Sequence, residues 1–177
     1  QTTVSPLPRS ENPEHAMPTT FILPKAADVS KTLVMLFGGN VPATPGKPVD
    51  TKPGSGNLII SYIDDEGKAV AAFVCDVPLA ANAGCALSMM PANAAKEAIK
   101  TKKLEPAMLD NLYEVANILS TLLMNDKTPH LRIATLYPDA GKVPAEVREM
   151  LSKAKGHADF TVNIPRYGNG CLSLLVV

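Results

Sequence analysis

The stretch LIISYIDDEGKAVAAFV, Leu58–Val74, is the part of the sequence from which the fold is inferred. Its two apolar runs, Leu58–Ile63 and Ala69–Val74, are rich in residues that favour strands. Between them lies Asp64-Asp65-Glu66-Gly67-Lys68, with the acidic residues and the glycine that are typical of a hairpin turn. The stretch therefore predicts an antiparallel hairpin.

Strands and helices are also predicted on both sides of this hairpin. Further strands are predicted at 131–137, 158–164 and 171–177, with a short edge strand around 49–52. Helices are predicted at 26–37, 78–90, 91–100 and 105–125, and an exposed helix is predicted at 144–155. This order indicates an α+β fold, with an antiparallel or mixed sheet and two long helices packed on one face.

The chain of 177 residues has the usual length of one domain. Residues 1–18 are rich in proline, serine and threonine and show no periodicity, so we expect a flexible tail there. Residues 19–177 are expected to form a single domain, with a proline- and glycine-rich loop at 40–56.

Composition argues against several classes of function. Lys+Arg 17 balances Asp+Glu 17, so the chain lacks the basic surface that nucleic acid or an anionic membrane would need. No apolar run approaches the ~20 residues of a membrane helix, and we expect a cytoplasmic protein. Cys75, Cys85 and Cys171 indicate free thiols, and neither they nor the three histidines have metal-ligand spacing.

One predicted helix presents a row of polar side chains. At about 100° per residue, Asp110, Glu114 and Asn117 fall within about 60° of one another, and Thr121 extends the same face. The opposite face is apolar and consists of Leu112, Val115, Ala116, Leu119, Leu122 and Leu123. The helix should therefore bury its leucines and direct two carboxylates and an amide outward.

This row has few chemical uses. It contains no nucleophile with an adjacent base, and its carboxylates share a ridge rather than face each other across a cleft. A carboxylate beside an amide is suited to docking on another protein and to holding a water for phosphoryl hydrolysis, which needs mostly positioning. The alternative is that these side chains are simply solvated.

The spacing D-x-x-x-E-x-x-N on a helix, followed by a proline at the end of a strand, resembles the signature of the CheC/CheX/FliY phosphatases. In this chain the residues are Asp110, Glu114, Asn117 and Pro138. The segments before and after the first helix, 21–24 and 41–48, are also similar to CheX. The resemblance covers about residues 21–177, and the single motif is closer to CheX than to CheC.

The resemblance implies a function. Glu114 would pair with a lysine of a phosphorylated CheY-like receiver domain, and Asn117 would enter its active site and orient the attacking water. Asp110 and Thr121 would belong to the docking face. The Mg²⁺ would belong to the receiver, so no cofactor or metal is expected in this chain. A homodimer is also expected, because residues 158–177 would otherwise leave long apolar strands as a bare sheet edge.

The chain also departs from the family pattern. Ile118-Leu119-Ser120-Thr121-Leu122 stands where the family has small residues, the spacing to Pro138 is slightly short, and the helix at 143–156 is an addition. A non-catalytic module that binds a receiver or a flagellar-switch partner is therefore the alternative function. A small-molecule sensor is a third reading, and it requires an apolar cavity under residues 78–90.

Overall fold

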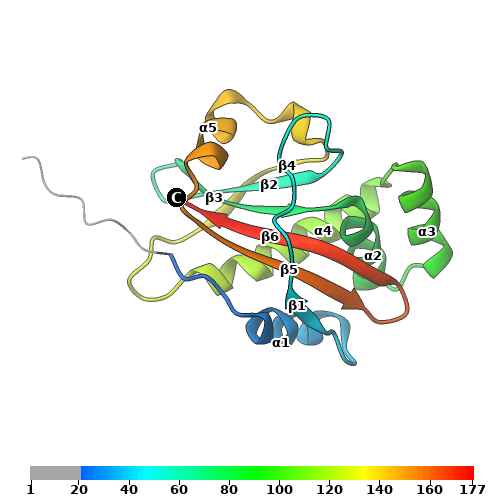
Figure 1. Cartoon of the computed structure of the whole chain (residues 1–177). Helices are drawn as coiled ribbons and strands as arrows, with labels where there is room; N and C mark the ends of the chain where they lie inside the picture. The colour runs from blue at the N-terminus through cyan, green and yellow to red at the C-terminus, as the bar shows by residue number, and fades with distance from the viewer. Residues whose placement is uncertain (1–20) are drawn as a thin grey trace, which may run out of the picture.

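The computed structural model describes residues 21–177, so the expected tail lies outside the described residues. Its centre is one antiparallel sheet of six strands in the order β1-β5-β6-β3-β2-β4 (Figure 1). The strands are β1 Ala43–Pro45, β2 Leu58–Ile63, β3 Ala69–Cys75, β4 Arg132–Tyr137, β5 Gly156–Ile164 and β6 Gly168–Val176. The predicted fold class is confirmed.

The predicted hairpin forms β2 and β3, with β3 at the middle of the sheet and β2 next to the outer strand β4. Leu58 pairs with Cys75, and the turn closes where the amide of Asp64 donates to the carbonyl of Lys68. The carboxylate of Asp64 accepts from the amides of Glu66 and Lys68, which is why an aspartate suits this position. Every residue of β3 is buried because both faces of the sheet are covered.

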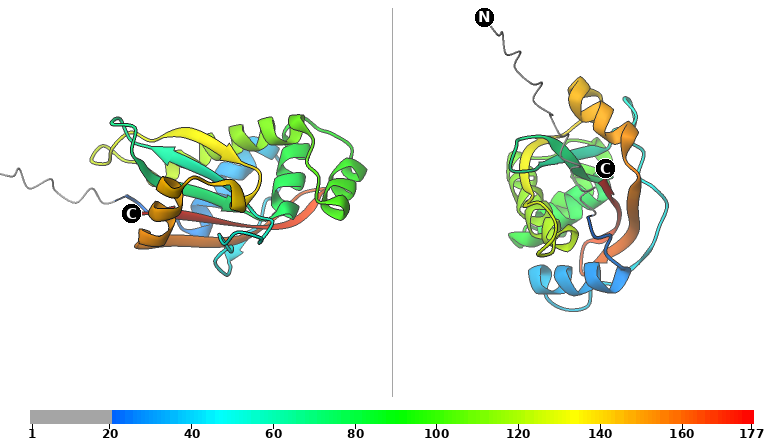
Figure 2. Two further views of the ribbon diagram at one scale, coloured as in Figure 1. Left: turned by 90° about the horizontal axis from the view of Figure 1, so that it is seen from above. Right: turned by 90° about the vertical axis from the view of Figure 1, so that its left-hand side faces the viewer.

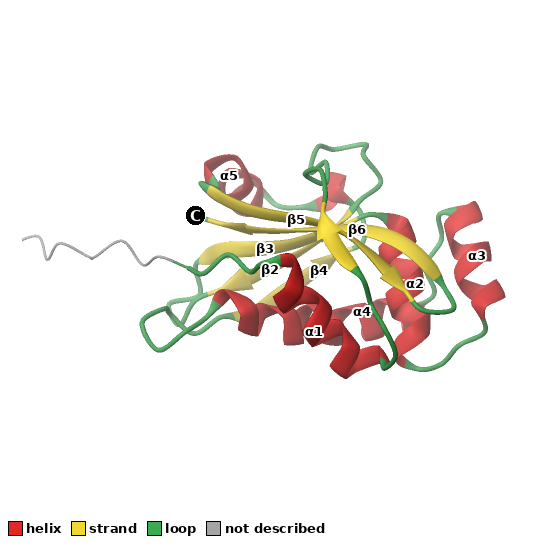
Figure 3. Ribbon diagram, turned by 60° about the horizontal axis from the view of Figure 1, so that its bottom comes forward, coloured by secondary structure: helices red, strands yellow, loops and turns green. Residues whose placement is uncertain are grey.

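Three helices cover one face of the sheet. They are α1 Ala26–Phe37, α2 Val77–Leu87 and α4 Pro106–Leu119, while α3 Ala92–Thr101 packs on α2 (Figure 3). The apolar stripes of α1, α2 and α4 meet the inner side chains of the strands in one large core, which includes Phe73, Leu112 and Leu172. The sheet thus supports α4 from below and leaves its polar side free.

The helix expected to be exposed, α5 Ala145–Lys153, instead covers the second face (Figure 2). Its apolar side chains Val147, Met150 and Leu151 are buried against the sheet, so the prediction of an exposed helix is wrong for this side of it. The guanidinium of Arg148 donates to the carbonyls of Thr51 and Ala140, which fastens α5 to the loop before β2 and to the short 3-10 helix η2, Ala140–Lys142.

Two predicted boundaries were also wrong. The short edge strand lies at Ala43–Pro45 and not at 49–52. At the predicted position, the backbone amide of Val49 donates a hydrogen bond to the hydroxyl of Ser173. The long helix expected to reach residue 125 ends at Leu119 and continues as a 3-10 turn, η1 Ser120–Leu123. The hydroxyl of Ser120 donates to the carbonyl of Asn117, and such side-chain competition favours the end of a helix.

The sheet edges are not where the sequence placed them. Residues 158–177 form β5 and β6, which lie between β1 and β3 inside the sheet, so the argument from a bare apolar edge is wrong. Within the described residues the outer strands are the short β1 and β4. The pairing of β2 with β4 is irregular next to Ala134, and β4 begins with Arg132, two features that discourage edge pairing. The homodimer stays a prediction.

Candidate functional site

Helix α4 places Asp110, Glu114 and Asn117 on the surface, and Thr121 follows in η1. Pro106 opens the helix, where a proline costs no hydrogen bond. The buried side consists of Met108, Leu112, Val115, Ala116 and Leu119. Asp110, Glu114, Asn117 and Thr121 are exposed, so the predicted separation into a buried and a polar face is confirmed.

The polar row is free of internal hydrogen bonds at its chemically useful positions. Within residues 21–177, the side chains of Asp110, Glu114 and Asn117 hydrogen-bond no other protein group. Thr121 differs, because its hydroxyl donates to the carbonyl of Ile118 at 2.7 Å within η1. Glu114 and Asn117 are three residues apart, which puts their Cβ atoms about 5–6 Å from each other on a helix.

The side of α4 that faces α2 is held by Asn111, a residue the sequence analysis did not single out. Its amide donates to the carbonyl of Gly84 at 2.7 Å and to the hydroxyl of Ser88 at 2.8 Å. A Cβ at Gly84 would lie 2.6 Å from the carbonyl oxygen of Met108, so the glycine lets the two helices approach closely. The orientation of the polar row is therefore set by α2 as well as by the sheet.

Pro138 comes from a different element of the fold, because it follows the end of β4. The hydroxyl of Tyr62 donates to the carbonyl of Ala116, which places the last turn of α4 over the pairing of Tyr62 with Ile133. Pro138 follows the end of β4, roughly 15 Å from Ile133 along the strand. Helix α4 therefore brings Glu114 and Asn117 together, while Pro138 is contributed by the segment after β4.

The cysteines do not supply a nucleophile to the site. Cys75 and Cys85 are fully buried, and burial raises the pKa of both thiols. Cys171 is half-buried, and burial raises its thiol pKa as well. A thiol with a raised pKa is a weak nucleophile at neutral pH. Among residues 21–177, no group of three or more His, Cys, Asp or Glu side chains is arranged to hold a metal ion.

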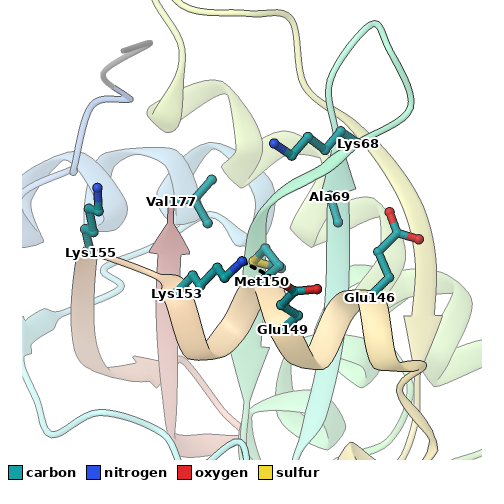
Figure 4. A pocket seen from close by; sticks show the side chains of 8 residues that line it. All are labelled: Lys68, Ala69, Glu146, Glu149, Met150, Lys153, Lys155 and Val177. Carbon is teal, nitrogen blue, oxygen red and sulfur yellow. Dashed lines mark hydrogen bonds and ion pairs between the residues drawn. The ribbon is translucent and has the colours of Figure 1, made fainter.

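A hollow of about 440 Å³ lies on the opposite side of the molecule, between α5, the turn before β3 and Val177 (Figure 4). Its rim carries Lys68, Lys153, Lys155, Glu146 and Glu149, and Glu149 pairs with Lys153 at 2.5 Å. That hydrogen bond lowers the pKa of the Glu149 carboxyl. With charges of both signs, the rim selects no particular ligand.

The first half of α2 leaves no room for the apolar cavity that a small-molecule sensor would require beneath it. A Cβ at Gly170 of β6 would lie 2.5 Å from the Cα of Leu79, so α2 rests directly on the sheet. Gly84 packs as closely against α4. At these two contacts there is accordingly no space for a ligand between α2 and its neighbours. None of the described helices is long and apolar enough to cross a membrane.

No protein-family model matches the chain, and a search of curated proteins gives no significant match. Solved structures do share its fold. CheX from Borrelia burgdorferi, in a complex with CheY, BeF3 and Mg, is 14% identical with a TM-score of 0.50, over 84% of this chain and 92% of that one. The FliM middle domain from H. pylori is 9% identical with a TM-score of 0.52, over 85% and 84%.

FliM from H. pylori in a complex with SpeE is also similar, at 9% identity and a TM-score of 0.52 over 85% of this chain and 80% of that one. These TM-scores establish a shared fold, and identities this low leave the activity to be argued from the residues of the chain. The chain therefore has the fold that CheX and the FliM middle domain share.

Proposed function

We propose that this chain is a phosphatase that hydrolyses the aspartyl phosphate of a CheY-type receiver domain. The observation that carries the proposal is the exposure of Glu114 and Asn117 one turn apart on α4, with no hydrogen bond between either side chain and any residue of 21–177. Side chains that are not used within the fold are available to a partner. The spacing of Glu114 and Asn117 also matches the motif that resembles CheX.

Asn117 is the catalytic residue in this proposal. Its amide can donate to one group and accept from another, so it can hold a water in line with the phosphorus without removing a proton. The water oxygen attacks phosphorus, the bond to the aspartyl oxygen breaks, and inorganic phosphate and a free carboxylate are released. Phosphoryl transfer needs mainly positioning and charge stabilisation. The receiver supplies the Mg²⁺, so this chain needs no cofactor of its own.

Glu114 is the docking residue. A carboxylate on an exposed ridge can pair with a lysine on the partner, which sets the orientation of encounter more than it adds affinity. Asp110 and Thr121 flank it on the same face, and the hydroxyl oxygen of Thr121 can still accept a hydrogen bond. The complex of CheX with CheY supports a receiver as the partner. The proposal places the chain in the cytoplasm and keeps the homodimer as an expectation.

A non-catalytic binding module is the second candidate, and one observation favours it. The helix ends at Leu119, and bulky residues such as Ile118 and Leu122 follow Asn117. A partner that must approach Asn117 closely would meet these side chains. The FliM middle domain shows that the same fold occurs in a flagellar-switch protein.

Phosphate release from phosphorylated CheY-type receivers separates the two candidates. The chain should accelerate release, and Asn117→Ala should lose that acceleration by on the order of 10²-fold because the water is no longer aligned. Asn93→Ala is the matched control, since Asn93 is an exposed asparagine on α3 outside the row. Equal release with wild type and Asn117→Ala would leave only the binding module.

A further inference from the structure

Two unusual backbone positions meet at one hollow beside the helical layer. In the described part of the chain, three residues other than glycine have a left-handed backbone, namely Met89, Lys102 and Arg166. Met89 and Arg166 both line a hollow of about 270 Å³ at the C-terminal ends of α1 and α2. Residues other than glycine are disfavoured in a left-handed backbone conformation. Two such residues at one hollow therefore call for a reason.

Met89 occupies the position after a helix where glycine is usual. Its amide donates to the carbonyl of Ala86, and the amide of Met90 donates to that of Cys85, the pattern that closes a helix with a left-handed residue. The side chain of Met89 is 79% exposed, so packing within the fold does not account for a methionine here. An exposed methionine is an adaptable apolar contact for another molecule.

Arg166 lies in the tight turn between β5 and β6. The amide of Tyr167 donates to the carbonyl of Ile164 at 3.0 Å, and Pro165 precedes the left-handed residue, as in a type II turn, where glycine is preferred. Arg166 is exposed and, among residues 21–177, is the only charged residue that lines the hollow. The remaining lining includes Phe37, Pro165 and Tyr167, so the hollow is complementary to an acidic group with an apolar neighbour.

The hollow is linked to the polar row of α4 through one hydrogen bond between side chains. Met89 follows Ser88, whose hydroxyl oxygen accepts a hydrogen bond from the side-chain amide of Asn111. Asn111 precedes Glu114 by three residues, about 4.5 Å along the helix axis. A standard interface covers about 800 Å² of each partner, a disc of roughly 16 Å radius, so a protein centred on Glu114 would reach Met89.

We propose that this hollow is the second half of the surface on which the receiver docks, with Met89 as its apolar anchor and Arg166 as the partner of a carboxylate on the receiver. The inference rests on the proposed function, because the receiver is the occupant in both. Glu114 and Arg166 then give the docking surface opposite charges at its two sides. Such a pattern fixes the orientation of a partner and rejects those with the reverse pattern.

Glycine variants test this inference cleanly, because glycine suits the backbone at both positions and the variants should fold at least as well as the wild type. Binding to CheY-type receivers loaded with BeF3 and Mg²⁺ is measured by calorimetry. Met89→Gly should raise the Kd about tenfold, as expected for an apolar hot spot. Met89→Leu should bind within about threefold of wild type, since it keeps the apolar surface.

Arg166→Gly should also weaken binding, and its difference from wild type should shrink as NaCl rises from about 0.05 to 0.5 M. Lys102→Gly is the matched control, because it relaxes the same backbone conformation outside the hollow and should leave the Kd unchanged. If wild type binds and both Met89→Gly and Arg166→Gly bind equally well, the hollow is not a docking surface and the proposed function stands. If no receiver binds the wild type, both proposals fall.

Discussion

The hydroxyl of Tyr62 on β2 donates a 2.6 Å hydrogen bond to the carbonyl oxygen of Ala116, the residue before Asn117. Neither residue has any exposed surface. The carbonyl oxygen of Ala116 also accepts a hydrogen bond from the backbone amide of Ser120. The sheet is therefore tied to α4 at the turn that carries the proposed catalytic amide. This contact joins the β2–β3 hairpin to the position on which the proposed chemistry depends.

Tyr62→Phe should lower the free energy of unfolding by about 1–2 kcal/mol, the usual effect of losing a buried hydrogen bond. The ring still fills its space, and the Ala116 carbonyl keeps its bond to Ser120, so a larger loss is not expected. Urea unfolding followed by circular dichroism measures the change. Phosphate release should fall several-fold, and a variant as stable as wild type would show that the bond does not support α4.

Stability should also decline in alkali. Burial raises the pKa of Tyr62, with a smaller contribution from Cys75, and burial likewise raises the thiol pKa values of Cys75, Cys85 and Cys171. A raised pKa means that the folded state favours the neutral form. Its stabilisation is complete below the unfolded pKa, about 8.5 for Cys and 10 for Tyr, and is lost as the pH rises toward the folded value.

Unfolding by urea at pH 7 to 11 checks this expectation. The free energy of unfolding should fall above about pH 8.5 and fall more steeply above about pH 10. Tyr62→Phe should lack the steeper part, because it removes the buried phenol whose ionisation the folded state disfavours. A curve with the same slope for both proteins would argue against the ionisation of Tyr62 as the cause.

Gly84→Ala should destabilise the fold by about 2–3 kcal/mol, because the new methyl group would overlap with the backbone of Met108. Backbone cannot rotate away as a side chain can, so α2 and α4 must separate. The Asn111 amide would then lose its bonds to Gly84 and Ser88. Thermal unfolding measures the loss. Gly67→Ala is the comparison without overlap, because nothing lies within 4 Å of the added carbon and only the left-handed backbone there, about 1–2 kcal/mol, should count.

Local patterns predicted the hairpin and the two faces of α4, because alternation and helical periodicity depend on neighbours in sequence. The strand order could not be predicted in this way, since β1 is paired with β5 across more than a hundred residues. The role of Asn111 could not be predicted for the same reason, because its partners Gly84 and Ser88 are distant in sequence, on α2 and at its C-terminal end. Met89 and Arg166 could not be predicted either, because a left-handed backbone at a residue other than glycine has no sequence signal.

Glu114→Ala should separate docking from catalysis. It removes one partner of the proposed intermolecular ion pair and leaves the Asn117 amide in place, so the receiver concentration for half-maximal phosphate release should rise about tenfold with little change in the maximal rate. Asn117→Ala should show the opposite, a lower maximal rate at an unchanged half-maximal concentration. Rates at saturating and limiting receiver concentration distinguish the two.

The control is Glu97→Ala, which removes an exposed carboxylate from α3 outside the polar row and should change neither parameter. The effect of Glu114→Ala should diminish as salt rises, because a solvent-exposed ion pair is screened within about 10 Å at 0.1 M. Both Glu114→Ala and Asn117→Ala should keep wild-type stability within about 0.5 kcal/mol, since neither side chain is buried. A fall in maximal rate alone for Glu114→Ala would assign this carboxylate to the chemistry and leave the docking contact to the rest of the surface.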